Sequence, residues 1–469
     1  MKDNEKSLFK NTFIIFISKF CTQFLSFFLL PLFTSILSTY EYGEFDLITT
    51  YACLLLPFMT IQLENGIFRF LIDVREDKKE TKNIVTNAFL GMIFQLVIFS
   101  IIYSILVIVF NIENGVYIFI YSFSYMLLSV FLQISRGMGD NISYSKSSLI
   151  VGITNVIFCI IFVYYCKLGL LGMVLAGIFS NLLGTIYLLF KKKILSYFSL
   201  EYFNKKDIKK LVKYSLPLVP NSLSSWIINI SDKVMISWFI GSSANGIFSV
   251  SSKFSTLLSH VYSVFNLSWT ESASVNSKDE ERDKFFSASI ENIFKICTCL
   301  CIITIAAMPI IFRIMINESF GEAYIYIPLK IIGTIFEIFS GLLGAVYISL
   351  KFSKNIAFST LVAGIINVII NFIFMKQYGI YVACFSTIIA YLLLSIYRLL
   401  DLKKYIKLKF NLISIASIFV MLAIQIYFYY KNSIVVSLIF TIIAIIYTFI
   451  LNKKLIFSFG DIVIKKLRK

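Results

Sequence analysis

Apolar segments about twenty residues long recur along the whole chain, and short polar stretches separate them. A helix of about 20 apolar residues crosses the roughly 30 Å hydrocarbon core of a bilayer. We therefore predict an all-α integral membrane protein with about fourteen transmembrane helices. The predicted spans are residues 11–37, 45–70, 84–110, 116–136, 147–166, 170–190, 214–239, 246–270, 285–312, 327–350, 356–375, 380–400, 410–430 and 434–451.

The charged residues support this class and predict an orientation. They make up 15% of the chain, against roughly a quarter in soluble proteins. The net charge of +17 lies in short Lys and Arg blocks between apolar segments, which argues against a nucleic-acid partner and favours contact with membrane lipids. With a cytoplasmic N-terminus, most basic residues fall inside, and both termini are cytoplasmic. The basic residues predicted outside are Lys167, Arg313, Lys376 and Lys431.

The two halves of the chain contain matching residues at constant spacing. The matched pairs include Gly43 with Gly246, Phe45 with Phe248, and Asn155 with Asn367. Six predicted helices separate the copies, so both copies enter the membrane in the same direction, as parallel repeats do. We predict an N-lobe (1–190, helices 1–6), a cytoplasmic interfacial linker (191–213) and a C-lobe (214–401, helices 7–12). Helices 13–14 (402–451) and a basic cytoplasmic tail (452–469) follow. Two such lobes around a cleft are typical of alternating-access transporters.

Ionisable side chains at membrane depth are the local pointers to function, because they are costly in hydrocarbon. Each deep charge is either part of a structural ion pair or faces a hydrated cavity, and the sequence leaves both open. The deep charges are Lys19, Glu64, Asp232, Lys233, Lys295 and Glu337. Arg69, Lys253, Glu291, Lys330 and Arg398 lie near helix ends, where we expect them to reach the interface. Pro217 and Pro220 are candidate hinges at the start of the seventh predicted helix.

Motifs of enzymes and metal sites are missing from the sequence. It contains no P-loop, no nucleophile motif and no His-rich metal site, and the eight cysteines lie in or beside apolar segments. The longest loop, 191–213, is too short for a catalytic domain. We therefore predict a protein that is not an enzyme and that uses no metal or other cofactor.

Two stretches carry a family resemblance. Residues 27–46 (FFLLPLFTSILSTYEYGEFD) resemble the start of bacterial polysaccharide-unit flippases, the Wzx-like branch of the multidrug/oligosaccharidyl-lipid/polysaccharide exporter superfamily. So do Ser231-Asp232-Lys233 and the following residues 245–249 (NGIFS). The resemblance implies a MATE-like fold in the cytoplasmic (inner) membrane. It also implies movement of sugar repeat units on undecaprenyl diphosphate, for O-antigen lipopolysaccharide or capsule, with polysaccharide assembly proteins as expected partners.

This resemblance assigns roles to the deep charges. Lys19, Lys233 and Lys295 would attract the diphosphate in the substrate cavity. Glu64, Asp232 or Glu337 would bind a coupling proton or sodium ion. The alternatives are an ion-coupled multidrug or organic-cation antiporter of the same superfamily and a lipid-linked peptidoglycan-precursor flippase.

Overall fold

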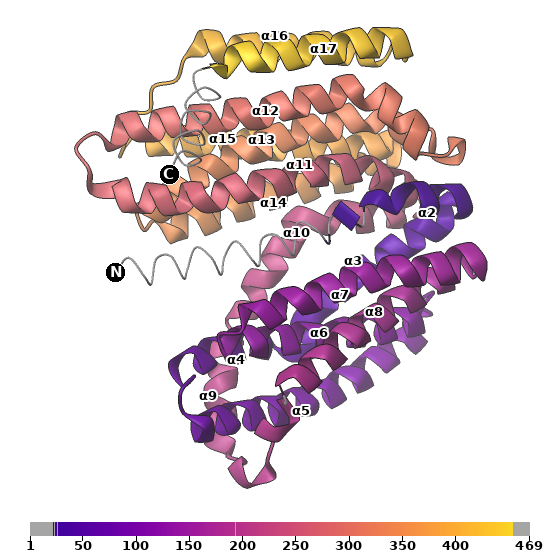
Figure 1. Cartoon of the computed structure of the whole chain (residues 1–469), viewed down its shortest axis with the longest axis vertical. Coiled ribbons are helices and arrows are strands. Elements are labelled where there is room, and N and C mark those ends of the chain that lie inside the picture. The colour runs from indigo at the N-terminus through magenta and orange to yellow at the C-terminus, as the bar shows by residue number, and fades with distance from the viewer. Residues whose placement is uncertain (1–21, 23, 26, 193, 454–469) are drawn as a thin grey trace, which may run out of the picture. The chain divides into compact units, whose positions relative to one another are not determined.

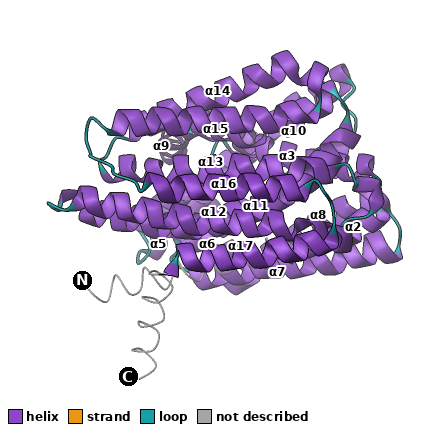
Figure 2. Ribbon diagram, turned by 90° about the horizontal axis from the view of Figure 1, so that it is seen from above, coloured by secondary structure: helices purple, strands orange, loops and turns teal. Residues whose placement is uncertain are grey.

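The computed structural model describes Thr22, Phe24, Leu25 and residues 27–192 and 194–453. These residues form helices joined by short loops, without a strand (Figure 2). Ten of the described helices are long and apolar enough to cross a membrane, or eleven with one bent pair counted as a single span. The protein is therefore a multi-pass, all-helical membrane protein, as predicted.

The predicted spans from residue 84 onward coincide with helices that differ by a few residues at their ends (Figure 1). These helices are α5 (Lys78–Phe110), α6 (Gly115–Gly137), α7 (Asn141–Cys159) continued by the π-helix η1 (Ile160–Tyr165), α8 (Gly169–Lys192), α10 (Leu218–Phe239), α11 (Ser242–Val275), α12 (Arg282–Met315), α13 (Ala323–Ser349), α14 (Ser353–Tyr378), α15 (Ile380–Leu402), α16 (Leu412–Tyr429) and α17 (Ile434–Leu451). Helices α10 and α11 are not among the ten apolar spans. The serines of α11 explain its polarity, since eleven of its 34 residues are Ser. Most of span 11–37 lies outside the described residues, and its described end is the short helix α2 (Leu30–Ile36). The count of fourteen spans therefore stays a prediction.

The second predicted span, 45–70, is two helices rather than one. Helix α3 (Thr39–Thr60) and helix α4 (Leu63–Asp73) meet at a 60° bend. Ile61 and Gln62 both have left-handed backbone angles, with φ of 52° and 58°. Pro57 lacks a backbone N–H for the helix ladder, and freed groups near the bend find side-chain partners. Gln95 Nε2 donates to the Phe58 carbonyl at 2.9 Å, and the Gln62 N–H donates to Thr60 Oγ1 at 3.1 Å.

Helix α3 begins at Thr39, earlier than predicted, because Ser38 and Glu41 form a capping box. The Glu41 N–H donates to Ser38 Oγ at 3.2 Å, and the Ser38 N–H donates to Glu41 Oε2 at 2.9 Å. This start places Glu44 inside the helix instead of in the preceding loop, and Asp46 in its second turn.

The predicted interfacial linker, 191–213, includes two short turns, η2 (Ile194–Tyr197) and η3 (Leu200–Tyr202), and most of helix α9 (Lys205–Ser215). Polar residues of α5 hold this segment. Asn87 Nδ2 donates to the Tyr202 carbonyl at 2.8 Å, and Asn87 Oδ1 accepts from the Asn204 N–H at 2.8 Å. Thr86 Oγ1 accepts from the Ser199 N–H at 3.1 Å. The linker is thus packed on the first helices of the chain.

The chain folds into two compact units, one of residues 1–237 and 241–246 and one of residues 238–240 and 247–469. This division lies at the α10–α11 connection, whereas the repeat predicts a boundary at 191–213. Packing and sequence repeats are different properties, so the lobe boundaries stay a prediction.

The matched residues nevertheless make equivalent contacts within their own units. In the first unit α8 packs on α6 and α7, and in the second α15 packs on α13 and α14. Asn155 of α7 donates to Ser180 Oγ of α8 at 3.3 Å. Its match, Asn367 of α14, donates to Ser386 Oγ of α15 at 3.1 Å. These corresponding three-helix groups support the internal repeat.

The last two helices, α16 and α17, pack on α12 within the second unit (Figure 1). Tyr324 and Tyr429 fix the end of α16 to the start of α13. Their rings stack with centroids 4.2 Å apart, and each hydroxyl donates to the backbone carbonyl of the other residue. Helices α16 and α17 are therefore an integral part of the second unit.

Candidate functional site

A buried ion pair joins α3 and α10 in the first unit. Lys233 Nζ lies 2.8 Å from Asp46 Oδ1, with side chains 26% and 9% exposed. Asn245 at the start of α11 donates to the other carboxylate oxygen, Asp46 Oδ2, at 3.4 Å. One turn further along α3, the Trp226 indole of α10 donates to the Thr50 carbonyl at 3.4 Å. Asp46 is therefore a functional candidate that sequence reasoning did not identify.

Two glycines let α3 and the start of α11 approach at this pair. A Cβ atom on Gly43 would lie 1.9 Å from the Ser242 carbonyl oxygen, and one on Gly246 would lie 2.1 Å from the Thr39 carbonyl oxygen. Asn245 Nδ2 donates to the Gly43 carbonyl at 3.0 Å. Gly43 and Gly246 are the residues that the internal repeat matches, so repeat-related positions meet each other here.

Glu44, one position along α3, extends this cluster. Its carboxylate accepts from Asn114 Nδ2 at 2.7 Å and from the Ser242 hydroxyl. We call Gly43, Glu44, Asp46, Lys233, Ser242, Asn245 and Gly246 the α3–α11 cluster. Its carboxylates, amides and hydroxyls hold the ends of three helices together by polar contacts.

Glu64 is buried at the bend between α3 and α4 and is 2% exposed. Asn65 Nδ2 lies 3.4 Å from Glu64 Oε1, and Asn65 also accepts from Gln133 Nε2 at 3.0 Å. Glu64 Oε2 and Gln133 Oε1 are buried without a hydrogen-bond partner among the described residues. Glu64 therefore has amide neighbours and no cationic partner within 4 Å in the described chain.

The other predicted site residues lie apart. Lys295 forms an ion pair with Glu291 one turn away on α12, and Glu291 also accepts from the Asn411 N–H at 2.9 Å. Glu337 of α13 accepts from the Ser259 hydroxyl of α11 at 2.9 Å. Asp232 is 8% exposed on α10, beside Lys233. Lys19 lies outside the described residues. Pro217 lies in the two-residue turn between α9 and α10, and Pro220 in the first turn of α10.

The expectation that Arg398 reaches the interface is wrong. Arg398 is 4% exposed and donates to the Ser340 carbonyl at 2.9 Å, to Thr360 Oγ1 at 2.7 Å and to Ser359 Oγ at 3.2 Å. Helices α13, α14 and α15 surround the guanidinium with neutral acceptors, which is why it stays inside the unit. The other helix-end residues differ: Arg69 is exposed and pairs with Asp73, and Lys330 lies 4.4 Å from the Phe248 ring centroid.

The signal for Asp46 was weak in the sequence, because its partner Lys233 is 187 residues away. The described residues contain no group of three His, Cys, Asp or Glu side chains that could hold a metal ion. Glu64 and Glu337 are instead single carboxylates with neutral hydrogen-bond partners.

Comparisons with known proteins place this fold. The family model described as "Polysaccharide biosynthesis protein" matches residues 8–270, more than half of the 469-residue chain. Comparison with curated proteins gives no match.

Solved structures of transporters share the fold. The lipid II flippase MurJ in an inward closed conformation superposes with a TM-score of 0.70 at 16% identity, covering 95% of this chain and 100% of that one. An inward-facing multidrug resistance MATE family transporter of the MOP superfamily gives 0.63 at 15% identity, covering 81% and 95%. A MATE transporter in complex with MaD3S gives 0.55 at 14% identity, covering 85% and 96%. The chain therefore belongs to the polysaccharide biosynthesis protein family, and its fold is similar to those of MurJ and the MATE transporters.

Proposed function

We propose that this protein flips undecaprenyl-diphosphate-linked oligosaccharide repeat units across the cytoplasmic membrane for O-antigen or capsule assembly. The observation that carries the proposal is the family match over residues 8–270. An uncompensated hydroxyl costs several kcal/mol in an apolar medium, so a head group with many hydroxyls needs a polar path. In this proposal the chain has both termini in the cytoplasm and works by alternating access.

The Asp46–Lys233 pair supports a role in handling the diphosphate. A diphosphate is an anion that can replace Asp46 as the partner of Lys233, so substrate arrival would exchange one ion pair for another. Lys19 is a second candidate for the same anion. Lys295 pairs with Glu291 of the same helix, and it stays a third candidate for the anion.

The α3–α11 cluster lies at the end of α3 that the charge pattern predicts to be outside. In our proposal its contacts break when the transporter opens outward. Releasing Asp46 from Lys233 would weaken that cluster, which couples binding of the diphosphate to opening at the outer surface. Pro217 and Pro220 stay proposed hinges for the movement of α10.

Glu64 and Glu337 are the proposed coupling residues, with Asp232 as a third candidate. A carboxylate inside the membrane with only neutral partners is costly, and binding a proton removes that cost. We favour a proton over sodium, because Asn65 and Thr60 beside Glu64, and Ser259 beside Glu337, do not form a shell of several oxygen ligands.

The experiment uses proteoliposomes with a fluorescent undecaprenyl-diphosphate oligosaccharide and a membrane-impermeant quencher. Flipping predicts that wild-type protein exposes lipid from the inner leaflet to the quencher, and that Lys233→Gln slows this exposure. Empty vesicles and Lys167→Gln, which removes a charge from a different part of the chain, are the controls. Absence of transfer together with efflux of an organic cation under a proton gradient would replace this proposal by the antiporter.

A further inference from the structure

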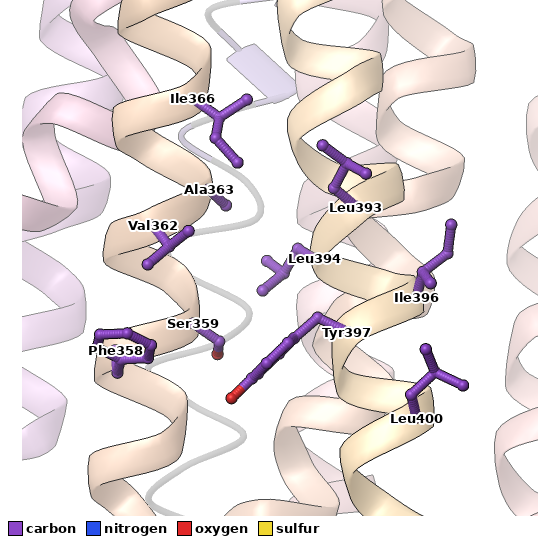
Figure 3. A pocket seen from close by; sticks show the side chains of 10 residues that line it. All are labelled: Phe358, Ser359, Val362, Ala363, Ile366, Leu393, Leu394, Ile396, Tyr397 and Leu400. Atoms are coloured by element: carbon purple, nitrogen blue, oxygen red, sulfur yellow. The ribbon is translucent and has the colours of Figure 1, made fainter.

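An apolar groove runs between α14 and α15 on the surface of the second unit (Figure 3). Its volume is about 380 Å³, and apolar side chains form most of its wall. Val362, Leu393 and Leu400 line it and are 37%, 43% and 56% exposed, so it opens to the surroundings of the unit. We expect those surroundings to be lipid, because α14 and α15 both have the length and hydropathy of membrane-spanning helices.

Phe358 and Leu400 form one end of the groove (Figure 3). Basic residues lie within about two helical turns of them along the chain. Phe352 and Tyr405 bring the start of α14 and the end of α15 together, with ring centroids 4.7 Å apart. Four exposed lysines flank this junction: Lys351, Lys354, Lys403 and Lys404. The charge pattern predicts that this end is cytoplasmic.

The net charge of this junction is positive. Its carboxylate, Asp401, accepts from Lys404 at 2.8 Å, from Tyr347 at 2.9 Å and from Asn355 at 3.2 Å. The hydrogen bond from Lys404 to Asp401 raises the pKa of Lys404. Among the described residues, none of the other three lysines forms an ion pair.

The buried guanidinium of Arg398 adds positive charge beside the wall of the groove. Ser359 lines the groove and accepts from Arg398 Nε at 3.2 Å. No carboxylate of the described chain lies within 4 Å of Arg398, whose other partners are neutral oxygens. The groove therefore combines an apolar channel with a cationic end, which matches an anionic headgroup joined to an acyl chain.

We propose that the α14–α15 groove binds an anionic phospholipid of the surrounding bilayer. The acyl chain lies along Val362, Leu393 and Leu400, and the phosphate lies among Lys351, Lys354 and Lys403. This site is separate from the α3–α11 cluster and does not depend on which substrate the protein moves. Only the assignment to the inner leaflet rests on the proposed orientation.

Native mass spectrometry of the full-length protein, titrated with phosphatidylglycerol or phosphatidylcholine of the same acyl chains, tests the site. We expect preferred binding of phosphatidylglycerol, and at least about tenfold weaker binding in the triple variant Lys351→Gln, Lys354→Gln, Lys403→Gln. Leu393→Trp fills the groove without touching a charge and should weaken binding of both lipids. The matched control combines Lys376→Gln, at the opposite end of α14, with Ile373→Trp, which is exposed on α14 outside the groove.

Three results would overturn the proposal. One is equal affinity for the two phospholipids, and another is a loss in the control variant as large as in the groove variants. The third is displacement of phosphatidylglycerol by undecaprenyl diphosphate at equal concentration, which would assign the groove to the transport path. Thermal unfolding of each variant confirms that a loss of binding is not a loss of fold.

Discussion

Lys233 depends on Asp46 because most of its side chain is out of contact with solvent, so each member of the pair lowers the cost of burying the other. We expect Asp46→Asn to lower the free energy of unfolding by about 2 kcal/mol, less than for a fully buried pair because Lys233 is part-exposed. The double variant Asp46→Asn, Lys233→Gln should recover part of this loss, because no unpaired charge remains. Thermal unfolding in detergent measures both.

The exposed pair of Glu281 and Lys284 is the matched control for this comparison. Glu281→Gln should change stability by less than about 0.5 kcal/mol, since exposed ion pairs contribute little. Additive losses in the double variant of Asp46 and Lys233 would mean that the two side chains are not coupled. In the flipping assay the double variant should remain slow, because stability returns and the cation for the diphosphate does not.

Glu64 and Glu337 differ from the Asp46–Lys233 pair because neither forms an ion pair among the described residues and their hydrogen-bond partners are neutral, although the charge of Lys330 also acts on Glu337. If either carries the coupling proton, its replacement by Gln keeps the shape and removes the titration. We expect Glu64→Gln or Glu337→Gln to make flipping insensitive to a pH gradient, while each variant still binds the lipid-linked substrate. Flipping measured with and without an imposed gradient tests this, and a variant that keeps the wild-type response excludes that residue.

At the scale of the element, the approach of α3 to α11 requires a residue without a side chain. A Cβ on Gly43 would overlap the Ser242 carbonyl, which is backbone and has no rotamer to change. We expect Gly43→Ala to cost about 1–3 kcal/mol of stability, as overpacking does. Gly333→Ala is the control, because its nearest neighbour is a side chain at 3.4 Å. Equal unfolding temperatures of the two variants would contradict the close approach.

The linker should loosen when its polar anchor on α5 is removed. Asn87 is fully buried and bonds the backbone of both Tyr202 and Asn204. Asn87→Ala leaves these backbone groups without a partner, at a cost of about 1–3 kcal/mol. We expect faster trypsin cleavage at the lysines of residues 191–213, read by mass spectrometry. Asn276→Ala, which removes one bond within α11 and η4 (Asn276–Lys278), should leave that rate unchanged.

Sequence reasoning located helices well and their interruptions poorly. Hydropathy follows the solvent around each segment, so span 434–451 coincides with α17. Pro57 is the one sequence signal for the bend near it, but the break at Ile61 and Gln62 escaped prediction because it also depends on partners such as Gln95, in another helix. A lysine within an apolar span stands out in the sequence, so Lys233 could be singled out. Its partner Asp46 could not, because their contact joins residues 187 positions apart.

At the scale of the whole molecule, the orientation follows from one bias, the placement of Lys and Arg in cytoplasmic loops. Helix α14 offers a compact test because it carries Lys354 in its first turn and Lys376 in its last. A crossing helix must place these two residues on opposite sides of the membrane. The proposed orientation puts Lys354 in the cytoplasm and Lys376 outside.

Two cysteine variants, Lys354→Cys and Lys376→Cys, each combined with Cys166→Ser, make this measurable. Cys166 is replaced because it is exposed beside Lys167, at another loop that we predict to be outside. A membrane-impermeant maleimide added to intact cells should label the variant at 376 and spare the one at 354 until the membrane is permeabilised. The opposite pattern would reverse every loop together, because each crossing helix fixes the side of the next. It would place the α3–α11 cluster at the cytoplasmic surface, and the step that its opening controls would become substrate entry instead of release.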